Sequence, residues 1–267
     1  MATAARPLIA LLTDFGTRDP YVAAMKLVIA SRADAELIDL GHDIAPHDVF
    51  EAAVFLRFAL ASLEGGRRTI VVSVVDPGVG SGRRIVAASR GARVLLAPDN
   101  GSLGLVIDAG WEIRSAENEA LFLHGPSSTF HGRDRFAPLA AALAAGLPLD
   151  RVGPRLALVD LVALPYDPPR VGVRDVEGSV IAVDRFGNAI TDVEVELLGN
   201  PREWRARAGG REIATHAATY AEREGSDEPF LIVGSRGTME ISLARGSAAD
   251  LLQLCRLDPV VFHRGTA

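Results

Sequence analysis

Three glycine-containing loops carry the polar side chains that are best suited to chemistry. They are Thr13–Gly16, the segment 75–84, and the segment 128–134. The second loop holds Asp76 and, seven residues later, Arg83, while the third holds His131. An aspartate, an arginine and a histidine from separate loops can orient and polarise a water molecule, because the carboxylate accepts a proton while the other groups fix the geometry. We therefore take Asp76, Arg83 and His131 as the candidate catalytic set.

Each loop also has a purely structural interpretation. Asp14 could cap a helix that starts near Pro20, and His131 could cap or pack against the helix that follows it. If Asp76 formed a surface ion pair with an arginine, the pair would contribute less than about 1 kcal/mol to the stability of the fold. An aspartate at the tip of a buried strand is better placed to hold a polar group. Two other classes are excluded. The Asp-Phe-Gly at 14–16 is not accompanied by the glycine-rich loop and strand lysine of a kinase, and the loop 75–84 lacks the Gly-Lys-Ser/Thr ending of a Walker loop.

The segment 41–48 contains two His-Asp pairs, at His42 and His47, which resemble the dense ligands of a metallohydrolase. Pro46 breaks any helix that would place both histidines on one face, and Asp48 suits a helix N-cap. No Glu-x-x-His completes a ligand set. We expect a pocket-lining loop and no bound metal, with a metallohydrolase through His42 and His47 as the weaker alternative.

Short apolar runs alternate with helical patterns over about the first 150 residues. This alternation predicts an α/β N-terminal domain with a mostly parallel sheet over residues 1–155. Loops at the carboxyl ends of its strands would meet at one sheet edge, where ligands collect. The expected strands are 8–13, 35–40, 69–75, 84–88 and 93–97, and the expected helices are 21–32, 48–61 and 136–145.

The alternation of apolar runs and helical patterns ends after Pro154. Residues 156–170, which include Tyr166-Asp-Pro-Pro169, read as an extended linker. Residues 171–267 predict a smaller all-β, barrel-like C-terminal domain, because short strands are separated by turns such as 184–188 and 235–237. The expected strands are 178–184, 190–195, 202–208, 230–234 and 239–243, followed by a helix at 248–254.

The composition of the chain limits the kinds of partner that it can bind. The 267 residues carry 28 Lys and Arg against 34 Asp and Glu, for a net charge of −6, so we expect no nucleic-acid partner. No apolar run reaches the roughly 18 residues of a membrane span, and the run Leu8–Leu12 is too short for a signal peptide. Cys255 is the only cysteine, which excludes an intrachain disulfide. A cytoplasmic protein without a membrane partner is expected.

Taken together, these segments resemble the S-adenosyl-L-methionine hydroxide adenosyltransferase family. Its members are adenosine-forming S-adenosylmethionine hydrolases, and their relatives include fluorinating and chlorinating enzymes. The resemblance runs nearly end to end through six ordered motifs: Thr-Asp-Phe-Gly at 13–16, Val-Asp-Pro-Gly-Val-Gly at 75–80, Ala-Pro-Asp-Asn-Gly at 97–101, Thr-Phe-His-Gly-Arg-Asp at 129–134, Asp-Arg-Phe-Gly-Asn at 184–188, and Ser-Arg-Gly at 235–237.

The resemblance implies hydrolysis of S-adenosyl-L-methionine to adenosine and L-methionine, by in-line attack of water or hydroxide on ribose C5′. It assigns the attacking water to Asp76, Arg83 and His131, a set that the halogenating relatives lack. No cofactor or metal is implied. Asp14 would hold the ribose hydroxyls and Asp19 the methionine amino group. The implied substrate-binding residues are Asp14, Asp19, Tyr21, His47 and Phe130 in the first half, and Asp184, Phe186, Asn188, Ser235 and Arg236 in the second.

In the second half, the resemblance implies that Ser235 and Arg236 bind the methionine carboxylate, and that Phe186 and Asn188 face the adenine. It also implies a homotrimer whose ligand lies between domains of adjacent chains. The chain departs from the family pattern at Ala244, where many relatives have asparagine. Two alternatives stay open: chlorinase-like, halide-dependent adenosyl transfer, with Gly132 leaving room for chloride, and a non-catalytic module that binds S-adenosylmethionine or adenosine.

Overall fold

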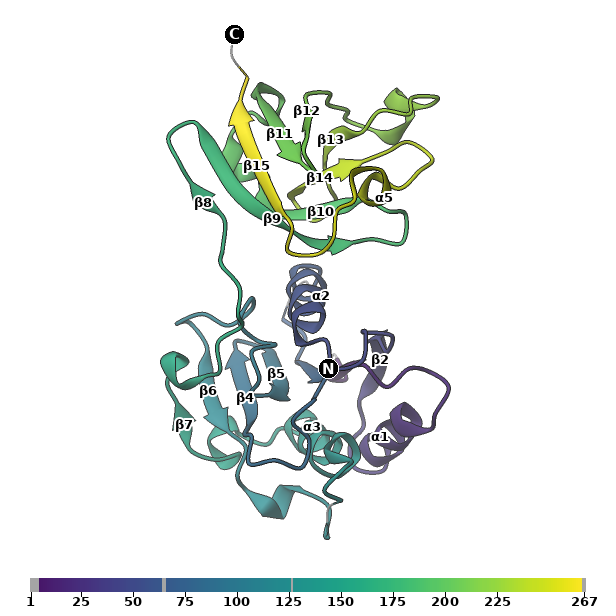
Figure 1. Ribbon diagram of the computed structural model, residues 1–267. Coiled ribbons are helices and arrows are strands. Elements are labelled where there is room, and N and C mark those ends of the chain that lie inside the picture. Colours follow the sequence, from purple (N-terminus) through teal and green to yellow (C-terminus); the bar gives the residue numbers. More distant parts are fainter. Residues whose placement is uncertain (1–4, 64–65, 126, 266–267) are drawn as a thin grey trace. The chain divides into compact units, whose positions relative to one another are not determined.

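The computed structural model describes residues 5–63, 66–125 and 127–265. The chain divides into two units, residues 1–165 and 166–267, each with its own sheet (Figure 1). The division falls within the segment 156–170 that the sequence suggests as a linker. Among the helices in the described ranges, none has the length and apolarity needed to cross a bilayer.

The first unit is built on a seven-stranded sheet with the order β2-β1-β3-β5-β4-β6-β7. Strand β1, which lies between β2 and β3, is buried along its whole length, as its sequence Leu-Ile-Ala-Leu-Leu-Thr predicts for a strand covered on both faces. The strands are β1 (Leu8–Thr13), β2 (Glu36–Gly41), β3 (Thr69–Val74), β4 (Ile85–Arg90), β5 (Arg93–Pro98), β6 (Glu112–Ser115) and β7 (Arg155–Leu156).

This sheet is mixed, so the prediction of a mostly parallel sheet is not confirmed. The pairs β1–β2, β1–β3 and β3–β5 are parallel, whereas β4–β5, β4–β6 and β6–β7 are antiparallel. For β4 and β5 the reason is the length of their connection. Only residues 91–92 join β4 to β5, and a connection this short can link only antiparallel strands.

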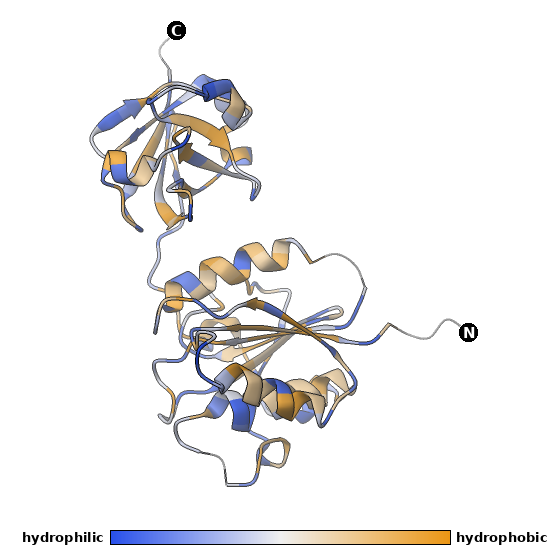
Figure 2. Cartoon of the chain, turned by 90° about the vertical axis from the view of Figure 1, so that its right-hand side faces the viewer, coloured by the Kyte–Doolittle hydropathy of each residue, from blue (hydrophilic) through white to orange (hydrophobic). Residues whose placement is uncertain are grey.

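Helices cover both faces of this sheet. Helix α2 (Val49–Ala61) packs on one face, where its Leu56 and Leu60 belong to the same apolar core as Ala10 and Leu12 of β1. On the other face, α1 (Tyr21–Ala30) and α3 (Ala137–Ala144) pack against the alternate side chains of β1. Figure 2 shows helices on either side of this sheet. The sequence predicted all three helices within one or two residues at each end.

The second unit is an eight-stranded, entirely antiparallel sheet that curves into a nearly closed barrel. The path runs β12-β11-β15-β9-β10-β14-β13, and β8 pairs with β9. Its elements are β8 (Arg170–Val171), β9 (Asp175–Val183), β10 (Ala189–Glu194), α4 (Val195–Leu198), β11 (Trp204–Ala208), β12 (Arg211–Ile213), β13 (Phe230–Val233), β14 (Thr238–Ser242), α5 (Ala248–Leu252) and β15 (Pro259–Arg264).

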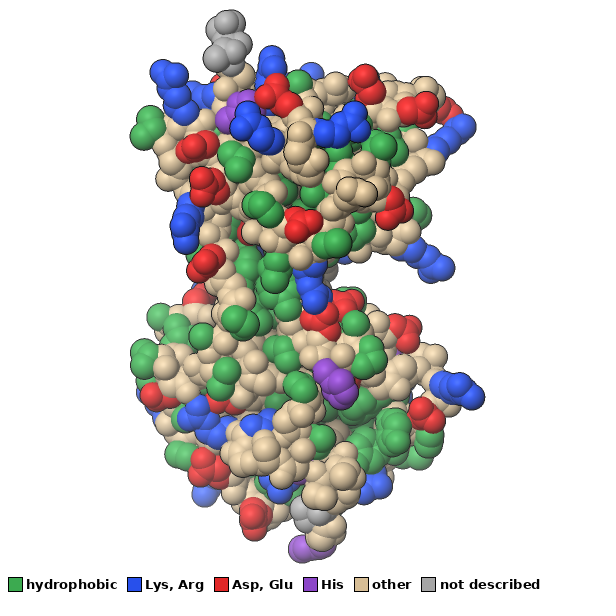
Figure 3. All heavy atoms as spheres, viewed as in Figure 1, with side chains coloured by type: hydrophobic (Ala, Val, Ile, Leu, Met, Phe, Trp, Pro, Cys, Tyr) green, Lys and Arg blue, Asp and Glu red, His purple; other side chains and the backbone are tan. Residues whose placement is uncertain are grey.

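The barrel-like form predicted for this unit is confirmed, although the sequence missed β15, which joins β9 to β11. Its interior is filled by the inward side chains of several strands, among them Val176, Trp204, Met239 and Phe262. On the face of the molecule in Figure 3, acidic and basic side chains are interspersed over both units.

Candidate functional site

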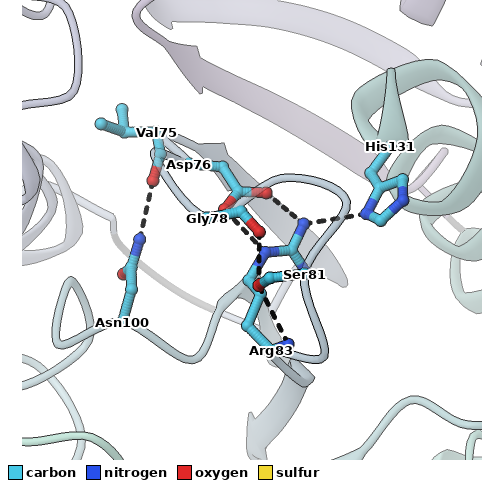
Figure 4. Close-up of polar contacts among 7 residues, drawn as sticks. All are labelled: Val75, Asp76, Gly78, Ser81, Arg83, Asn100 and His131. Carbon is cyan, nitrogen blue, oxygen red and sulfur yellow. Dashed lines mark hydrogen bonds and ion pairs between the residues drawn. The ribbon is translucent and has the colours of Figure 1, made fainter. Parts of the chain in front are cut away.

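The three candidate catalytic side chains meet at one place in the first unit. Asp76 follows the buried strand β3, Arg83 precedes β4, and His131 precedes a π-helix at Gly132–Phe136. Arg83 Nε donates to Asp76 Oδ1 at 2.6 Å, and Arg83 Nη2 donates to Asp76 Oδ2. The same Nη2 lies 3.0 Å from His131 Nδ1 (Figure 4). The Arg83 and Asp76 side chains are only 9% and 5% exposed, so this is a buried, bidentate ion pair with a histidine attached.

The contact with Arg83 fixes the protonation of His131. A guanidinium can only donate hydrogen bonds, so Nδ1 is the acceptor and the imidazole carries its proton on Nε2. Burial, and then the positive charges of Arg135 and Arg83, lower the pKa of His131 against the opposing effect of Asp76 and Asp134. The histidine is therefore neutral near pH 7, with one N–H left to donate.

The loop between Asp76 and Arg83 is held by its own backbone and by its neighbours. Asn100 Nδ2 donates to the carbonyl of Val75 at 2.9 Å, which anchors the residue before Asp76. Gly80 has a φ of +82°, and a Cβ there would lie 2.6 Å from the carbonyl oxygen of Ser128. Only glycine fits both the conformation and the approach. The aspartate and the arginine thus turn back toward each other over a rigid loop.

The loop before His131 is fixed by a second buried carboxylate. Asp134 accepts hydrogen bonds from the Ser127 amide at 2.7 Å and from Arg133 Nε at 2.5 Å. Burial opposes the ionisation of Asp134, but the bonds from Arg133 and Ser127 outweigh burial and lower its pKa. His131 stands at the start of a π-helix, a form of backbone that is frequent at functional sites.

A cavity of about 520 Å³ opens in front of this set. Asp76 and His131 line it, while Arg83 is not among the lining residues and supports them from behind. The rings of Phe15, Tyr21 and Phe130 pack edge to face, with centroids 5.1–6.0 Å apart, and form an apolar wall.

Asp14 and His47 also line this cavity, and Asp14 Oδ2 accepts a hydrogen bond from the His47 amide at 2.9 Å. The N-cap of α1 is Pro20, without a side-chain hydrogen bond, so Asp14 does not cap that helix. Asp19 is exposed and does not line the cavity. The structure therefore gathers six of the eight residues predicted for the first half on the walls of one cavity: Asp14, Tyr21, His47, Asp76, Phe130 and His131.

A second cavity, of about 750 Å³, lies in the C-terminal unit. All five of the residues predicted there line it: Asp184, Phe186, Asn188, Ser235 and Arg236. Asp184 Oδ1 accepts from the amides of Phe186 and Asn188, and its Oδ2 accepts from Asn188 Nδ2, each at 2.9 Å. Phe186 is 77% exposed, which leaves its ring available to stack on a flat ligand.

Sequence reasoning missed four polar residues on the wall of this second cavity. Two are Arg245 and Ser247, and the other two, Tyr220 and Glu240, have shifted pKa values. Burial raises the pKa of both side chains, and for Glu240 the negative charge of Asp184 adds to the effect while Arg236 opposes it. The signal for Glu240 was a single acid within the apolar run Thr-Met-Glu-Ile-Ser of β14.

The two histidines of the metal alternative lie in different surroundings. His42 is buried, with Nδ1 2.9 Å from Thr13 Oγ1 and Nε2 3.0 Å from Asp39 Oδ1, whereas His47 is exposed with a φ of +67°. Asp48 caps α2 as predicted, accepting from the Glu51 amide at 2.9 Å. Within the described ranges, no three histidine, cysteine or acidic side chains gather in a way that could hold a metal ion.

Comparison with known proteins places the chain in a family. Residues 9–153 match the SAM hydroxide adenosyltransferase N-terminal domain, and residues 178–261 match the C-terminal domain of the same name. The chain belongs to the SAM hydroxide adenosyltransferase family.

Its relatives include the (R)-S-adenosyl-L-methionine hydrolase of Thermus thermophilus, which is 39% identical over 93% of this chain and 96% of the relative. The hydrolase of the same name from Salinispora arenicola is 37% identical over 93% of this chain and 95% of the relative. A fluorinase from Actinopolyspora mzabensis is 28% identical, over 91% and 92%. The crystal structure of an uncharacterized conserved protein from Thermotoga maritima superimposes with a TM-score of 0.87 at 36% identity, covering 96% of this chain and 100% of that one.

Proposed function

We propose that this protein hydrolyses S-adenosyl-L-methionine to adenosine and L-methionine, by attack of water on ribose C5′. The observation that carries the proposal is the hydrogen-bonded Asp76–Arg83–His131 set, two members of which line a cavity that also has an aromatic wall. Family membership, and relatives named (R)-S-adenosyl-L-methionine hydrolase at 37–39% identity, support the same reaction.

The chemistry suits these side chains. The oxygen of water forms a bond to C5′ while the C5′–sulfur bond breaks, and the electron pair leaves with sulfur as a neutral thioether. A sulfonium is a good leaving group, so the reaction needs little acid assistance. It needs one water held in line behind C5′, and such alignment can supply several kcal/mol of the barrier.

In this mechanism Asp76 accepts the proton that the water loses. Both of its oxygens already accept from Arg83, but each carboxylate oxygen has a second lone pair. The positive charge of Arg83 stabilises the developing hydroxide. His131, neutral and with its proton on Nε2, orients the water by donating to its oxygen. None of these steps requires a metal ion.

The substrate contacts belong to the same proposal. In the first cavity, Asp14 would bind the ribose hydroxyls, while Tyr21, His47 and Phe130 would enclose the sugar and the reacting carbon. Asp19 would reach the methionine amino group. In the second cavity, the adenine and methionine contacts would come from Asp184, Phe186, Asn188, Ser235 and Arg236.

We also propose that the chain forms a homotrimer in which the cavities of different copies complete one another, with residues 1–155 and 171–267 as the two functional domains. Support comes from the distribution of the proposed contacts, since the water-holding set and the adenine contacts belong to different units. Cytoplasmic localisation, and the absence of nucleic-acid and membrane partners, stay predictions.

The test is product analysis. Incubation with S-adenosyl-L-methionine in halide-free buffer should release adenosine and methionine, and ¹⁸O-labelled water should place its oxygen in the adenosine 5′-hydroxyl. Product formation only when chloride or fluoride is added would instead favour halide-dependent adenosyl transfer. Tight binding without product would favour a non-catalytic module. Label outside the 5′-hydroxyl would reject attack at C5′.

A further inference from the structure

One histidine of the segment 41–48 takes no part in the proposed reaction. His42 is 6% exposed and is not among the residues that line the first cavity. Its Nδ1 lies 2.9 Å from Thr13 Oγ1, and its Nε2 lies 3.0 Å from Asp39 Oδ1. Asp39 Oδ2 in turn accepts a hydrogen bond from Lys26 Nζ at 2.6 Å. A carboxylate, an imidazole and a hydroxyl are thus aligned in the order that some hydrolases use to activate a nucleophile.

The Thr13 hydroxyl is not placed to act as a nucleophile. Thr13 is the last residue of β1 and is fully buried, so a substrate atom cannot reach it. Its Oγ1 also accepts a hydrogen bond from the Phe15 amide at 3.2 Å. Because the Asp39 carboxylate can only accept, the proton of the neutral imidazole belongs on Nε2, and Nδ1 accepts from the Thr13 hydroxyl. The hydrogen bonds therefore run in one direction, from the Phe15 amide to Asp39.

Both ends of this relay are firmly held. Burial opposes the ionisation of Asp39, but the bonds from Lys26 and His42 outweigh burial and lower its pKa, so the carboxylate stays ionised. Asp39 belongs to β2, which pairs with β1. The relay therefore ties the end of β1 to the neighbouring strand through side chains as well as through the backbone.

The relay ends at the loop that carries Asp14. Thr13 comes directly before Asp14, which lines the first cavity. His42 holds this loop at two points, because its side chain contacts Thr13 and its carbonyl accepts from the Gly16 amide at 2.7 Å. A displacement of His42 would therefore be transmitted to Asp14 from both sides.

We propose that His42 is a positioning residue that holds Asp14 where it can bind the ribose hydroxyls of the substrate. The inference rests on the proposed function, which supplies the ribose. An imidazole with a partner at each nitrogen cannot rotate, so it fixes the Thr13 hydroxyl and the start of the loop. A binding group must be held within about 0.5 Å of its productive position, and the residues behind it supply this constraint.

The test compares two substrates that differ at one ribose hydroxyl: S-adenosyl-L-methionine and its 2′-deoxy analogue. The measured quantity is the ratio of their kcat/KM values, from release of adenosine or 2′-deoxyadenosine, and the wild type should prefer the natural substrate. Asp14→Ala sets the scale and should lower this ratio by about 10- to 100-fold, since it removes a charge-assisted hydrogen bond. Thr13→Val and His42→Gln should each lower the ratio by about 3- to 10-fold, because they displace Asp14 without removing it.

Thr69→Val is the matched control for Thr13→Val. Thr69 is also a buried threonine of this sheet, 5% exposed, and its hydroxyl donates to the Arg67 carbonyl at 3.1 Å. It pairs with Leu8, at the other end of β1 from Thr13. Thr69→Val therefore removes a buried hydroxyl without touching the relay, and it should keep the wild-type ratio.

Two further comparisons test the direction of the relay. His42→Asn keeps an acceptor near the position of Nδ1 and should retain more of the ratio than His42→Gln, which keeps only a donor near the position of Nε2. When His42→Gln is added to Asp14→Ala, the ratio should not fall further, because the group that the relay positions is already gone.

An unchanged ratio in Thr13→Val or in His42→Gln overturns the inference alone, and so does an equal loss in Thr69→Val or a further loss in the double variant. A ratio in His42→Asn no higher than in His42→Gln, or an unchanged ratio in Asp14→Ala, does the same. If the His42 variants do not fold, Thr13→Val, which keeps the shape of the side chain, still decides. A wild type that releases no adenosine from S-adenosyl-L-methionine overturns the proposed function and this inference with it.

Discussion

The substitution Asp76→Asn separates the chemical role of the buried ion pair from its structural role. The amide keeps the shape of the carboxylate and one acceptor oxygen, but it leaves the 9%-exposed Arg83 side chain without its counter-charge. Removing one partner of a buried pair destabilises by about 3–5 kcal/mol. The retained acceptor favours the lower value, so for a unit of this size we expect thermal unfolding about 6–12 °C lower. Loss of the proton acceptor should lower kcat by about 10²- to 10⁴-fold.

The neighbouring pair provides a control of the same chemistry. Asp99 Oδ2 accepts from Arg84 Nε at 2.8 Å, and Asp99 is 8% exposed, yet neither residue lines the cavity. Asp99→Asn should therefore leave kcat close to wild type, and it should lower stability by less than Asp76→Asn does, because the Arg84 side chain is 35% exposed and solvent screens its charge. The assay is adenosine release by chromatography, at a temperature well below both unfolding midpoints. Equal losses of kcat in the two variants would show that the effect of Asp76 is structural and would refute the reasoning.

Three further predictions address the pH dependence, the loop and the absence of a metal. The pKa of His131 is lowered in the folded protein, so below about pH 6.5 the unfolded chain binds more protons and the wild type loses stability as the pH falls. In His131→Gln, urea unfolding at a series of pH values should show a smaller loss of stability as the pH falls. An unchanged loss would contradict the lowered pKa of His131. Gly80→Ala should lower stability by about 1–3 kcal/mol and reduce kcat, because the new Cβ would meet the Ser128 carbonyl at a residue with positive φ. Calorimetry measures the stability and the adenosine assay measures kcat. A variant with unchanged stability and kcat would show that the loop adapts. Dialysis against EDTA should leave kcat unchanged, whereas a loss that a metal restores would revive the site at His42 and His47.

The elements of the first unit were predictable because their patterns are local. The β-branched run at 69–74 and the capped helix that follows Asp48 each carry their own signal, and both are confirmed. The reversed direction of β4 was also within reach, since the expected strands 84–88 and 93–97 are too close in the sequence for a parallel crossover. The pairing of β4 with β6 was not, because it joins segments that are distant in the sequence. The strand β15 was missed because Pro259 opens it and His263 and Arg264 close it, which resembles a polar tail, although Phe262 is fully buried.

In the candidate site, too, contacts between residues close in the sequence were predictable, and features that depend on distant packing were not. Asp76 and Arg83 are seven residues apart around a glycine loop, and their pairing was within reach of the sequence. The position of Arg83 behind the wall, rather than on it, depends on packing that no motif encodes. Glu240 escaped notice because a lone acid in a strand is usually taken as a solvent-facing residue, and only the closure of the barrel buries it.

The two contacts of the Arg83 guanidinium enclose very different lengths of chain. The pair with Asp76 closes a segment of seven residues, whereas the contact with His131 spans 48 residues and depends on the docking of the π-helix and α3. The entropy of ordering a short segment is small, and it grows with the length enclosed. Loosening of the α3 layer would therefore detach the histidine first and leave the ion pair intact. A partly unfolded chain of this kind would keep its charges in place and still be unable to orient a water molecule.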